Sequence, residues 1–535
     1  MSRVLILGGY GVFGGRLARL LLRDGHEVIV AGRSRARAAA FCARHGGMPE
    51  AIDRDGALVL PPGLVALVDA SGPFSTAGPD PYRVARGALA AGAHYFDLSD
   101  DAAFTAGIVE LDGMARAAGR VALSGVSSVP ALSAAAVRAL AEGLERIDLI
   151  ESAILPGNAA PRGRSVMASI LSQAGEPLAL TREGQRIEAV GWSEPAPLDL
   201  APGLSRRAHL IGAPDLALFP GRFGARTVLF RAGLELWPMR AGLALMATAR
   251  RYGLLPPLTR LLPVLLPLAQ LLSPFGTDRG GMVVRVVGPR EGRRVERRWH
   301  LVAERGEGPF CPAIPARALI RRLAALPPGA RPCLDDLVLA EAEAAMTDLA
   351  LRCETLPERG ASLFDRVEGL DLATLPAPVR ALHDVYDTAL FEREARVQRG
   401  RGPPAWLACT LLRFPPEAER VPVTVRMTRD GDSETWTRRF GERTFRSVLR
   451  LDRGRMTARF GPATFTLDLT VAEGALHFPG VAGRIGWLSI PRVLPHVSRA
   501  RERVDGGRAC FDVDVSLPLG LGRVIRYRGW LARVA

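Results

Sequence analysis

A glycine-rich turn between two apolar runs constrains the fold of this chain more than any other feature of its sequence. Residues 4–7 predict a buried strand, residues 15–23 a helix, and residues 27–31 a second strand. The turn between the first strand and the helix has the spacing G-x-G-x-x-G, formed by Gly9, Gly11 and Gly14. In this setting the spacing is typical of a βαβ unit that binds the pyrophosphate of a dinucleotide at the N-terminus of its helix.

The six residues of this turn are the predicted cofactor-binding loop. Gly9 is expected to permit the tight turn, Gly11 to let the pyrophosphate approach the backbone, and Gly14 to let the helix pack closely against the strand. The residues between these glycines belong to the same predicted loop: Tyr10, Val12 and Phe13. The loop therefore predicts a Rossmann domain that binds a dinucleotide.

The end of the second predicted strand indicates which dinucleotide binds. An NAD enzyme normally has Asp or Glu about 20 residues beyond the glycines, where the carboxylate holds the ribose hydroxyls. This chain has Arg33 and Ser34 there. A guanidinium can form two hydrogen bonds with a 2′-phosphate, whereas a carboxylate would repel it. We therefore predict NADP as the cofactor, while Arg35 and Arg37 are expected to be solvated helix residues.

Three later strand-like runs end in polar residues that are expected at the carboxyl edge of the same sheet, where ligands bind. The run over 64–74 ends in a turn predicted to contact the cofactor: Ser71, Gly72, Pro73 and Phe74. The run over 91–101 contains the residues predicted to be catalytic, through substrate positioning or proton transfer: Tyr95, Asp97 and Asp101. The alternative is that Asp97 caps a helix or orders the turn. The third run ends in the serines of 124–128.

These motifs resemble the saccharopine dehydrogenase-like family, including its reductase and trans-acting enoyl reductase relatives. The matching pieces are GGYGVFG, AGRS, ASGPF, HYFDLSDD and GVSSVP. The resemblance covers the first 130 residues and continues more loosely to about residue 350. Members typically have Y-x-D-x-x-x-E, so Asp101 stands where the family has a longer Glu. The resemblance implies NADP and hydride transfer, and it leaves the substrate open.

The terminal zone is similar to a bacterial domain of unknown function found fused behind such modules. The matching stretches are ALHDVYD, ETWTRRFG, FRSVLR and FDVDVSLPLGLGRVIRYRGWL. The resemblance alone suggests the candidate site residues of this zone: His383, Asp384, Trp436, Arg439, Tyr527 and Arg528. The alternative for the aromatic pair is packing within a sheet.

The length of 535 residues requires more than one hydrophobic core. We predict an α/β Rossmann domain with a parallel sheet at 1–130, because short apolar runs alternate with helical stretches there. A central α+β domain for substrate binding or dimerisation is predicted at 131–370. An antiparallel β-rich domain is predicted at 376–535 from its alternating pattern, with one leading helix over 377–395.

Residues 241–275 form the most apolar stretch of the chain. Four prolines and one central arginine argue against a regular transmembrane helix: Pro256, Pro257, Pro263, Pro267 and Arg260. We expect a buried helix pair that lines an apolar substrate cavity. The alternative is a shallow contact with an anionic membrane, in which Arg250 and Arg251 lie at the headgroups.

Composition removes several classes of function. The net charge is +15, and all 70 basic residues are Arg. Without Lys, the catalytic form of a Tyr-x-x-x-Lys short-chain dehydrogenase is excluded. Arg alternates with apolar residues in the terminal zone, which favours a solvated sheet face over a nucleic-acid surface. The six Cys and eight His have no metal-ligand spacing, so we expect no metal and no nucleic acid as a partner.

The sequence thus predicts an NADP-dependent oxidoreductase that reduces a C=O, C=N or C=C bond in an apolar or lipid-like small molecule. A cytoplasmic location is expected, because no secretory signal is seen at Met1, and it would be peripheral to the inner membrane if the tract contacts lipid. The alternative function is a non-catalytic NADP-binding sensor or scaffold whose C-terminal domain binds a ligand. Association of two copies of the chain as a homodimer stays open.

Overall fold

The chain divides into two compact units. The computed structural model describes residues 2–56, 58–75, 78–161, 163–411, 413–486, 488–490, 498–516 and 522–534. The first unit contains Met1–Pro289 and Arg297–Pro357, and the second contains Arg290–Glu296 and Glu358–Ala535. The boundary predicted near residue 130 falls within the first unit. Part of one resembling stretch in the terminal zone, residues 517–521, lies outside the described residues.

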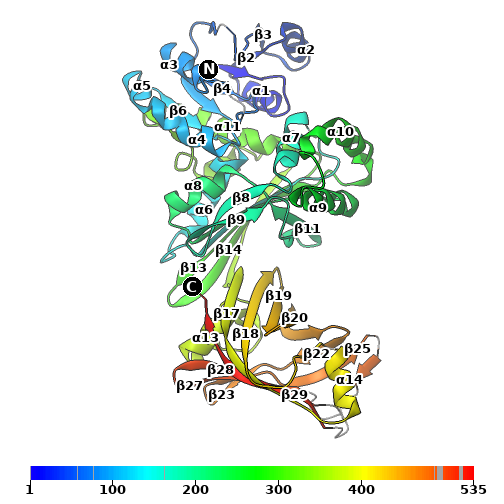
Figure 1. Cartoon of the computed structure of the whole chain (residues 1–535). Coiled ribbons are helices and arrows are strands. Elements are labelled where there is room, and N and C mark those ends of the chain that lie inside the picture. Colours follow the sequence, from blue (N-terminus) through cyan, green and yellow to red (C-terminus); the bar gives the residue numbers. More distant parts are fainter. Residues whose placement is uncertain are drawn as a thin grey trace. The chain divides into compact units, whose positions relative to one another are not determined.

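A seven-stranded parallel sheet forms the N-terminal part of the first unit (Figure 1). Its order is β15-β6-β5-β4-β1-β2-β3, which contains the doubly wound arrangement of a Rossmann domain. The strands are β1 (Arg3–Leu7), β2 (Glu27–Gly32), β3 (Met48–Ala51), β4 (Ala66–Asp69), β5 (His94–Asp97), β6 (Val121–Ser124) and β15 (Gly329–Pro332). The predicted parallel α/β sheet is confirmed, and β15 joins it from some 200 residues further along the chain.

Helices cover both faces of this sheet, because alternate residues of its buried strands point to opposite sides. Leu5, Leu67 and Tyr95 belong to a core shared with α3 and α5. On α11, the nearly buried Arg317 bonds both Asp24, at the end of α1, and Asp348. The helices are α1 (Gly14–Arg23), α2 (Arg35–His45), α3 (Arg83–Ala90), α4 (Ala102–Gly107), α5 (Asp112–Ala117), α6 (Ser133–Ala141), α11 (Ile314–Arg321) and α12 (Leu339–Ala344).

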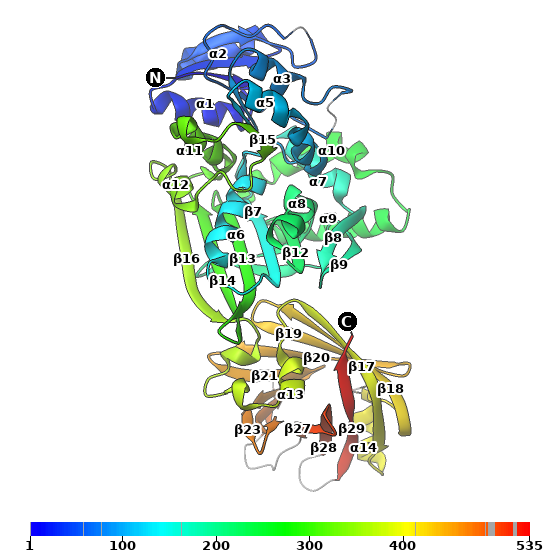
Figure 2. The same ribbon diagram turned by 90° about the vertical axis from the view of Figure 1, so that its left-hand side faces the viewer.

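A mixed nine-stranded sheet follows in the first unit (Figure 2). Its main path is β10-β11-β12-β7-β13-β14-β16, and β8 and β9 join beside β12. The strands are β7 (Leu149–Leu155), β8 (Pro177–Arg182), β9 (Gln185–Val190), β10 (Ala196–Ala201), β11 (Leu204–Leu210), β12 (Thr227–Gly233), β13 (Gly280–Arg290), β14 (Arg293–Ala303) and β16 (Leu351–Gly360). Helices α7 (Arg164–Gln173) and α8 (Pro214–Phe223) connect them.

The apolar tract forms α9 (Trp237–Arg251), η3 (Leu258–Leu261), α10 (Leu262–Leu271) and η4 (Ser273–Phe275). The expectation of a wholly buried helix pair is wrong, because large apolar side chains of these helices face solvent. The buried apolar residues of the tract are Leu243, Ala247, Leu258, Leu262 and Ala269. Among the helices that the structure describes, none combines the length and the apolarity needed to cross a bilayer.

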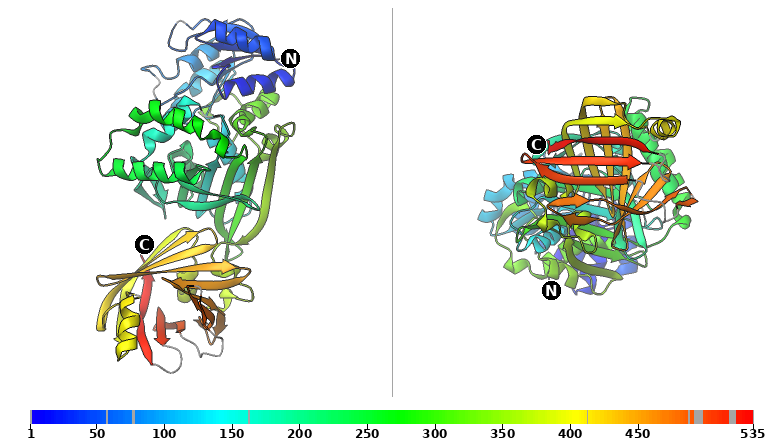
Figure 3. Two further views of the ribbon diagram at one scale, coloured as in Figure 1. Left: turned by 90° about the vertical axis from the view of Figure 1, so that its right-hand side faces the viewer. Right: turned by 90° about the horizontal axis from the view of Figure 1, so that it is seen from below.

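The second unit is built on a thirteen-stranded antiparallel sheet, which confirms the predicted β-rich domain (Figure 3). Its order is β23-β24-β27-β28-β29-β17-β18-β19-β20-β21-β22-β25-β26. The strands are β17 (Thr388–Arg399), β18 (Ala418–Asp430), β19 (Ser433–Phe440), β20 (Arg443–Asp452), β21 (Arg455–Phe460), β22 (Ala463–Leu467), β23 (Thr470–Ala472), β24 (Ala475–His477), β25 (Gly480–Ile485), β26 (Leu488–Ile490), β27 (Ser498–Asp505), β28 (Arg508–Ser516) and β29 (Arg523–Arg533). Helices α13 (Ala377–His383) and α14 (Pro403–Leu411) accompany the sheet.

The leading helix predicted over 377–395 is wrong beyond His383. The helix ends there, and residues from Thr388 onward form β17, which pairs with β18 and β29. Ala389, Phe391 and Ala395 are buried along this strand. Pairing with two neighbouring strands therefore overrides the helical preference of the Glu and Ala residues in the segment.

Candidate functional site

The glycine-rich turn leaves β1 in a conformation that requires glycine at its first position. Gly8 has φ +77°, and a Cβ there would lie 2.6 Å from the carbonyl oxygen of Ala70. The left-handed residue of the tight turn is thus Gly8 rather than Gly9. Gly9 has no room either, since its Cβ would lie 2.8 Å from the carbonyl oxygen of Ile6.

Gly11 and Gly14 differ in what surrounds them. A Cβ on Gly14 would lie 2.4 Å from the carbonyl oxygen of Gly8, so this glycine allows α1 to approach the strand, as expected. A Cβ on Gly11 would meet only that same oxygen, at 3.0 Å, and Gly11 is exposed. The space beside Gly11 is therefore open on the side where a pyrophosphate is expected.

Three backbone N–H groups at the start of α1 are free to bind an anion. Within the residues that the structure describes, the N–H groups of Val12, Phe13 and Gly14 form no hydrogen bond. They lie at the N-terminal end of α1, where the helix dipole also favours negative charge. This is the donor set that a dinucleotide pyrophosphate needs, so the residues present fit the predicted cofactor.

Tyr10 attaches the turn to the end of β2. Its hydroxyl accepts a hydrogen bond from the backbone N–H of Ser34 at 3.1 Å, and the guanidinium of Arg37 lies 4.9 Å from the centre of its ring. The Ser34 side chain caps α2 by accepting from the backbone N–H of Arg37. Arg33 is exposed, and across the described ranges no hydrogen bond or ion pair involves its guanidinium. Its charge is available to an anionic ligand.

Hydrogen bonds to the Asp69 carboxylate order the turn after β4. The Oδ1 atom of Asp69 accepts from the backbone N–H and the hydroxyl of Ser71, at 2.9 and 2.5 Å. Gly72 and Pro73 are exposed beside it, while Phe74 is buried against Phe104 with ring centres 4.9 Å apart. Phe74 therefore packs in the core, and the exposed part of this predicted cofactor contact is Gly72 and Pro73.

Asp97 organises the next turn of the carboxyl edge. It lies opposite Asp69 in the β4–β5 register and is fully buried. Its Oδ1 atom accepts from the backbone N–H groups of Ser99 and Gly125 and from the Ser124 hydroxyl, at 2.8–3.0 Å. Burial raises the pKa of Asp97 to about 7 against the lowering effect of these hydrogen bonds. A carboxyl with this pKa can gain or lose a proton near neutral pH.

The other two predicted catalytic residues have structural contacts. Tyr95 is buried in the core that contains Phe104, and burial together with the nearby Asp97 raises its pKa well above the usual value. The Asp101 carboxylate caps α4 by accepting from the backbone N–H of Phe104 at 2.8 Å. Helix capping, considered above for Asp97, thus occurs at Asp101. Catalytic roles for these three residues stay predictions.

The protonation of Asp97 gives an expected pH dependence of stability. Its folded pKa of about 7 lies above the ordinary value of 3.8, so folding favours the protonated form. Its contribution is fully present below pH 3.8, is lost as pH rises to about 7, and amounts to about 4 kcal/mol. Urea unfolding at pH 5 and pH 8 should show about 3 kcal/mol of this loss, because part of it has already occurred by pH 5. Asp97→Asn, which keeps the Oδ1 acceptor, should remove most of that difference. Equal pH dependence in both proteins would contradict the assignment.

Asp215 is a buried carboxyl that the sequence analysis missed. It lies in the first turn of α8, is fully buried, and burial raises its pKa to about 7. The nearby Ser133 and Ser152 hydroxyls oppose this rise in the pKa. In the sequence it is an ordinary acidic residue after a proline, a common pattern at a helix start, and its burial comes from packing of α8 against β12.

The second unit contains a separate buried polar cluster. His383 Nε2 bonds the Glu502 carboxylate, and the indole N–H of Trp436 bonds Glu434. Among described residues, His383 Nδ1 and Glu434 Oε2 are buried without a hydrogen-bond partner. Burial raises the pKa of Glu434 and lowers that of Arg438, which bonds the Ser447 hydroxyl at 2.7 Å.

The register of the sheet decides which candidates of this zone belong to that cluster. Trp436 and Tyr527 are buried on the inner face, so packing within the sheet accounts for both. Arg439 and Arg528 are exposed on the outer face, and Arg438 lies inside instead. Asp384 lies outside the cluster and forms an ion pair with Arg294. The alternation alone could not indicate which face is the inner one.

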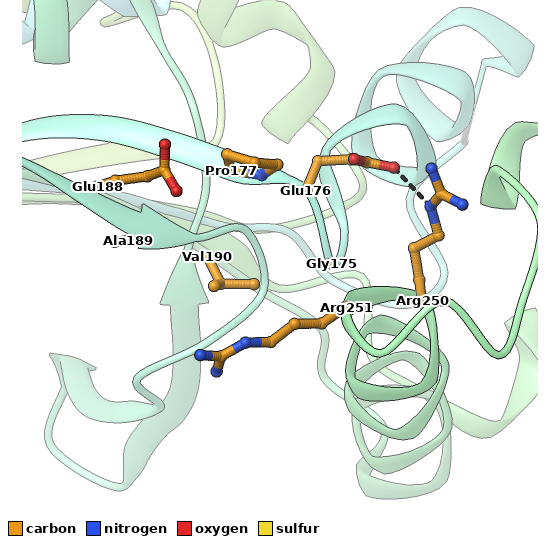
Figure 4. A pocket seen from close by; sticks show the side chains of 9 residues that line it. Gly175, Glu176, Pro177, Glu188, Ala189, Val190, Arg250 and Arg251 are labelled. Carbon is orange, nitrogen blue, oxygen red and sulfur yellow. Dashed lines mark hydrogen bonds and ion pairs between the residues drawn. The ribbon is translucent and has the colours of Figure 1, made fainter.

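A hollow of about 440 Å³ lies beside the end of α9, away from the glycine turn (Figure 4). Arg250 is bonded to Glu176 at 2.7 Å, whereas Arg251 extends toward Val190. The residues that line it are Gly175, Glu176, Pro177, Glu188, Ala189, Val190, Arg250, Arg251 and Gly253. None of the predicted site residues lines this hollow.

Comparison with known families agrees with the resemblance expected for the terminal zone. Residues 375–531 match a domain of unknown function (DUF4166). This is the region in which the sequence resembles an unknown domain. No match to the chain is found among curated proteins.

The chain is also similar to solved structures of oxidoreductases. One is the apo histidine-tagged saccharopine dehydrogenase (L-Glu forming) from Saccharomyces cerevisiae, at 13% identity, covering 67% of this chain and 100% of that one, with a TM-score of 0.46. Another is biliverdin reductase in complex with biliverdin and NADP+ from Synechocystis sp. PCC 6803, at 14% identity, with 65% and 96% covered and a TM-score of 0.29. At these identities the likeness concerns the fold.

Proposed function

We propose that this chain is an NADP-dependent oxidoreductase that reduces a C=O, C=N or C=C bond in an apolar or lipid-like substrate. The observation that carries the proposal is the donor set at the start of α1, where Val12, Phe13 and Gly14 have free N–H groups beside the open side of Gly11. The unpaired Arg33 at the end of β2 supports NADP over NAD, because a 2′-phosphate needs a cation there.

The proposed roles follow from these positions. The α1 donors hold the pyrophosphate, Arg33 holds the 2′-phosphate, and the exposed Gly72 and Pro73 border the cofactor at the end of β4. NADPH, when bound, supplies a hydride. Of the three predicted catalytic residues, Asp97 is the one whose pKa, raised by burial to about 7, suits exchange of a proton near neutral pH. The apolar composition of residues 241–275 is the feature that favours an apolar substrate.

The test of this proposal is a reversal of charge at Arg33. We expect NADPH to bind at least tenfold more tightly than NADH, and Arg33→Asp to remove that preference, since loss of a charge-assisted hydrogen bond costs about 1.5–3 kcal/mol. Fluorescence titration with both nucleotides measures it. The matched control is Arg35→Asp, which makes the same charge change at an exposed residue on α2 and should leave the preference intact. An unchanged preference in Arg33→Asp would remove Arg33 from the site.

The rival function, a non-catalytic NADP-binding sensor, has one observation in its favour. Tyr95 packs in a core and Asp101 caps a helix, so neither is free for proton transfer in this structure. NADPH oxidation with a panel of apolar aldehydes, ketones, imines and enoyl thioesters distinguishes the two. Turnover that Asp97→Asn reduces supports the enzyme, whereas tight NADPH binding without turnover of any class supports the sensor.

A further inference from the structure

Exposed large apolar side chains concentrate in the segment from α9 to η4. Of the eighteen such side chains among the described residues, eight lie between residues 237 and 275, with exposed fractions from 48% to 76%. Isolated exposed apolar residues are ordinary on soluble proteins, but a concentration of them marks an interaction surface. These eight residues define the α9–α10 face: Trp237, Leu245, Tyr252, Leu254, Val264, Leu268, Leu271 and Phe275.

The last four of these side chains lie on one side of α10 and η4. On α10 and η4 the exposed side chains recur at intervals of four, three and four residues, from Val264 to Phe275. Residues with this spacing lie on a single helical stripe. The opposite side of α10, with Leu262 and Ala269, is buried against the rest of the first unit. α10 therefore has apolar side chains on its exposed side as well as on its buried side.

The charged residues within this segment are all arginines. Between residues 237 and 277 the sequence has four Arg and no Asp or Glu. Arg251 and Arg260 are exposed, and across the described ranges neither guanidinium has an acidic partner. Arg250 is the exception, since Glu176 neutralises it. An apolar face with unpaired arginines is complementary to a surface that combines acyl chains with anionic headgroups.

We propose that the α9–α10 face binds the surface of an anionic lipid bilayer. Trp237 and Tyr252 have amphipathic rings suited to the headgroup level, while the leucines reach the acyl boundary. Because no described helix is long and apolar enough to span a bilayer, the contact lies in the interface plane.

A second copy of the chain is a poorer occupant of this face. A two-fold symmetric interface pairs a surface with itself, so the arginines would meet arginines and no carboxylate. The proposal does not depend on the oxidoreductase assignment.

Flotation of the full chain with vesicles tests the proposal, and no cofactor is added. Vesicles of phosphatidylcholine with phosphatidylglycerol should carry the protein upward at low salt, and binding should weaken as salt screens the arginines. Pure phosphatidylcholine vesicles should bind it much more weakly. Leu254→Glu with Leu271→Glu should reduce binding at least tenfold. Arg251→Ser with Arg260→Ser should reduce it by roughly fivefold for each arginine lost.

Control variants show whether vesicle binding depends on the α9–α10 face or on exposed apolar and charged residues anywhere on the chain. Val59→Glu places the same carboxylate on an equally exposed apolar residue outside the face, and Arg443→Ser with Arg446→Ser removes two exposed arginines of β20. Both controls should bind vesicles like the unchanged chain. The proposal is overturned if the chain does not float or if face and control variants bind equally. It is also overturned if sedimentation shows a dimer that Leu254→Glu with Leu271→Glu dissociates.

Discussion

Replacing Gly11 by Val is expected to abolish NADPH binding and to leave the fold intact. The added side chain would project into the open side of the turn, where the pyrophosphate is expected, and its Cβ would meet only the Gly8 carbonyl oxygen within 4 Å. Binding should weaken by at least a hundredfold in a fluorescence titration, while the far-ultraviolet circular dichroism spectrum stays the same.

The same substitution at two other glycines serves as a control for Gly11→Val. Gly113→Val adds the same side chain on α5, where nothing lies within 4 Å of the added Cβ, and it should leave NADPH binding unchanged. Gly14→Val would push against the Gly8 carbonyl oxygen at 2.4 Å, so it should lower stability as well as binding. Normal NADPH binding by Gly11→Val would place the nucleotide elsewhere.

The second large effect is expected at Glu151 in the mixed sheet. This buried carboxylate bonds Arg231 at 2.6 Å and Arg285 at 3.0 Å. Glu151→Ala leaves both guanidinium groups buried without this carboxylate, and removing one partner of a buried ion pair costs about 3–5 kcal/mol. Urea unfolding followed by circular dichroism should show a loss of this size.

The control for Glu151 is the same substitution at an exposed ion pair. The side chain of Glu419 is 79% exposed and bonds Arg396. Surface ion pairs contribute about 0–1 kcal/mol, so Glu419→Ala should change the unfolding free energy by no more than that. If Glu151→Ala also costs under about 1 kcal/mol, the two arginines find other partners and the network is not what stabilises the sheet.

The Rossmann unit could be predicted from the sequence because its signals are local. The strand, the glycine turn and the helix follow one another within residues 3–23. Atoms close to the turn explain why its glycines are needed. Strand β15 could not be predicted, because Gly329–Pro332 has no apolar run and its pairing with β6 depends on the distant fold. The strand at Thr388 was missed for the same reason, since pairing with β18 and β29 outweighs local helix preference.

Only the part of the candidate site that the backbone forms could be predicted from the sequence. The turn from Gly9 to Gly14 and the position of Arg33 at the end of β2 follow from spacing alone. Burial does not follow from spacing, so the core position of Tyr95 and the buried carboxyl of Asp215 were not foreseen. The apolar tract is a second case in which burial could not be predicted. Its composition suggested that it is buried, whereas the structure exposes eight of its large side chains.

The central claim is that NADPH binds at the glycine turn with its 2′-phosphate on Arg33. A crystal structure of the chain soaked with NADPH tests it most directly. The account predicts a pyrophosphate oxygen within hydrogen-bond distance of the N–H groups of Val12 and Phe13, and the 2′-phosphate beside the Arg33 guanidinium. A nucleotide bound anywhere else, or a 2′-phosphate turned away from Arg33 into solvent, would contradict it.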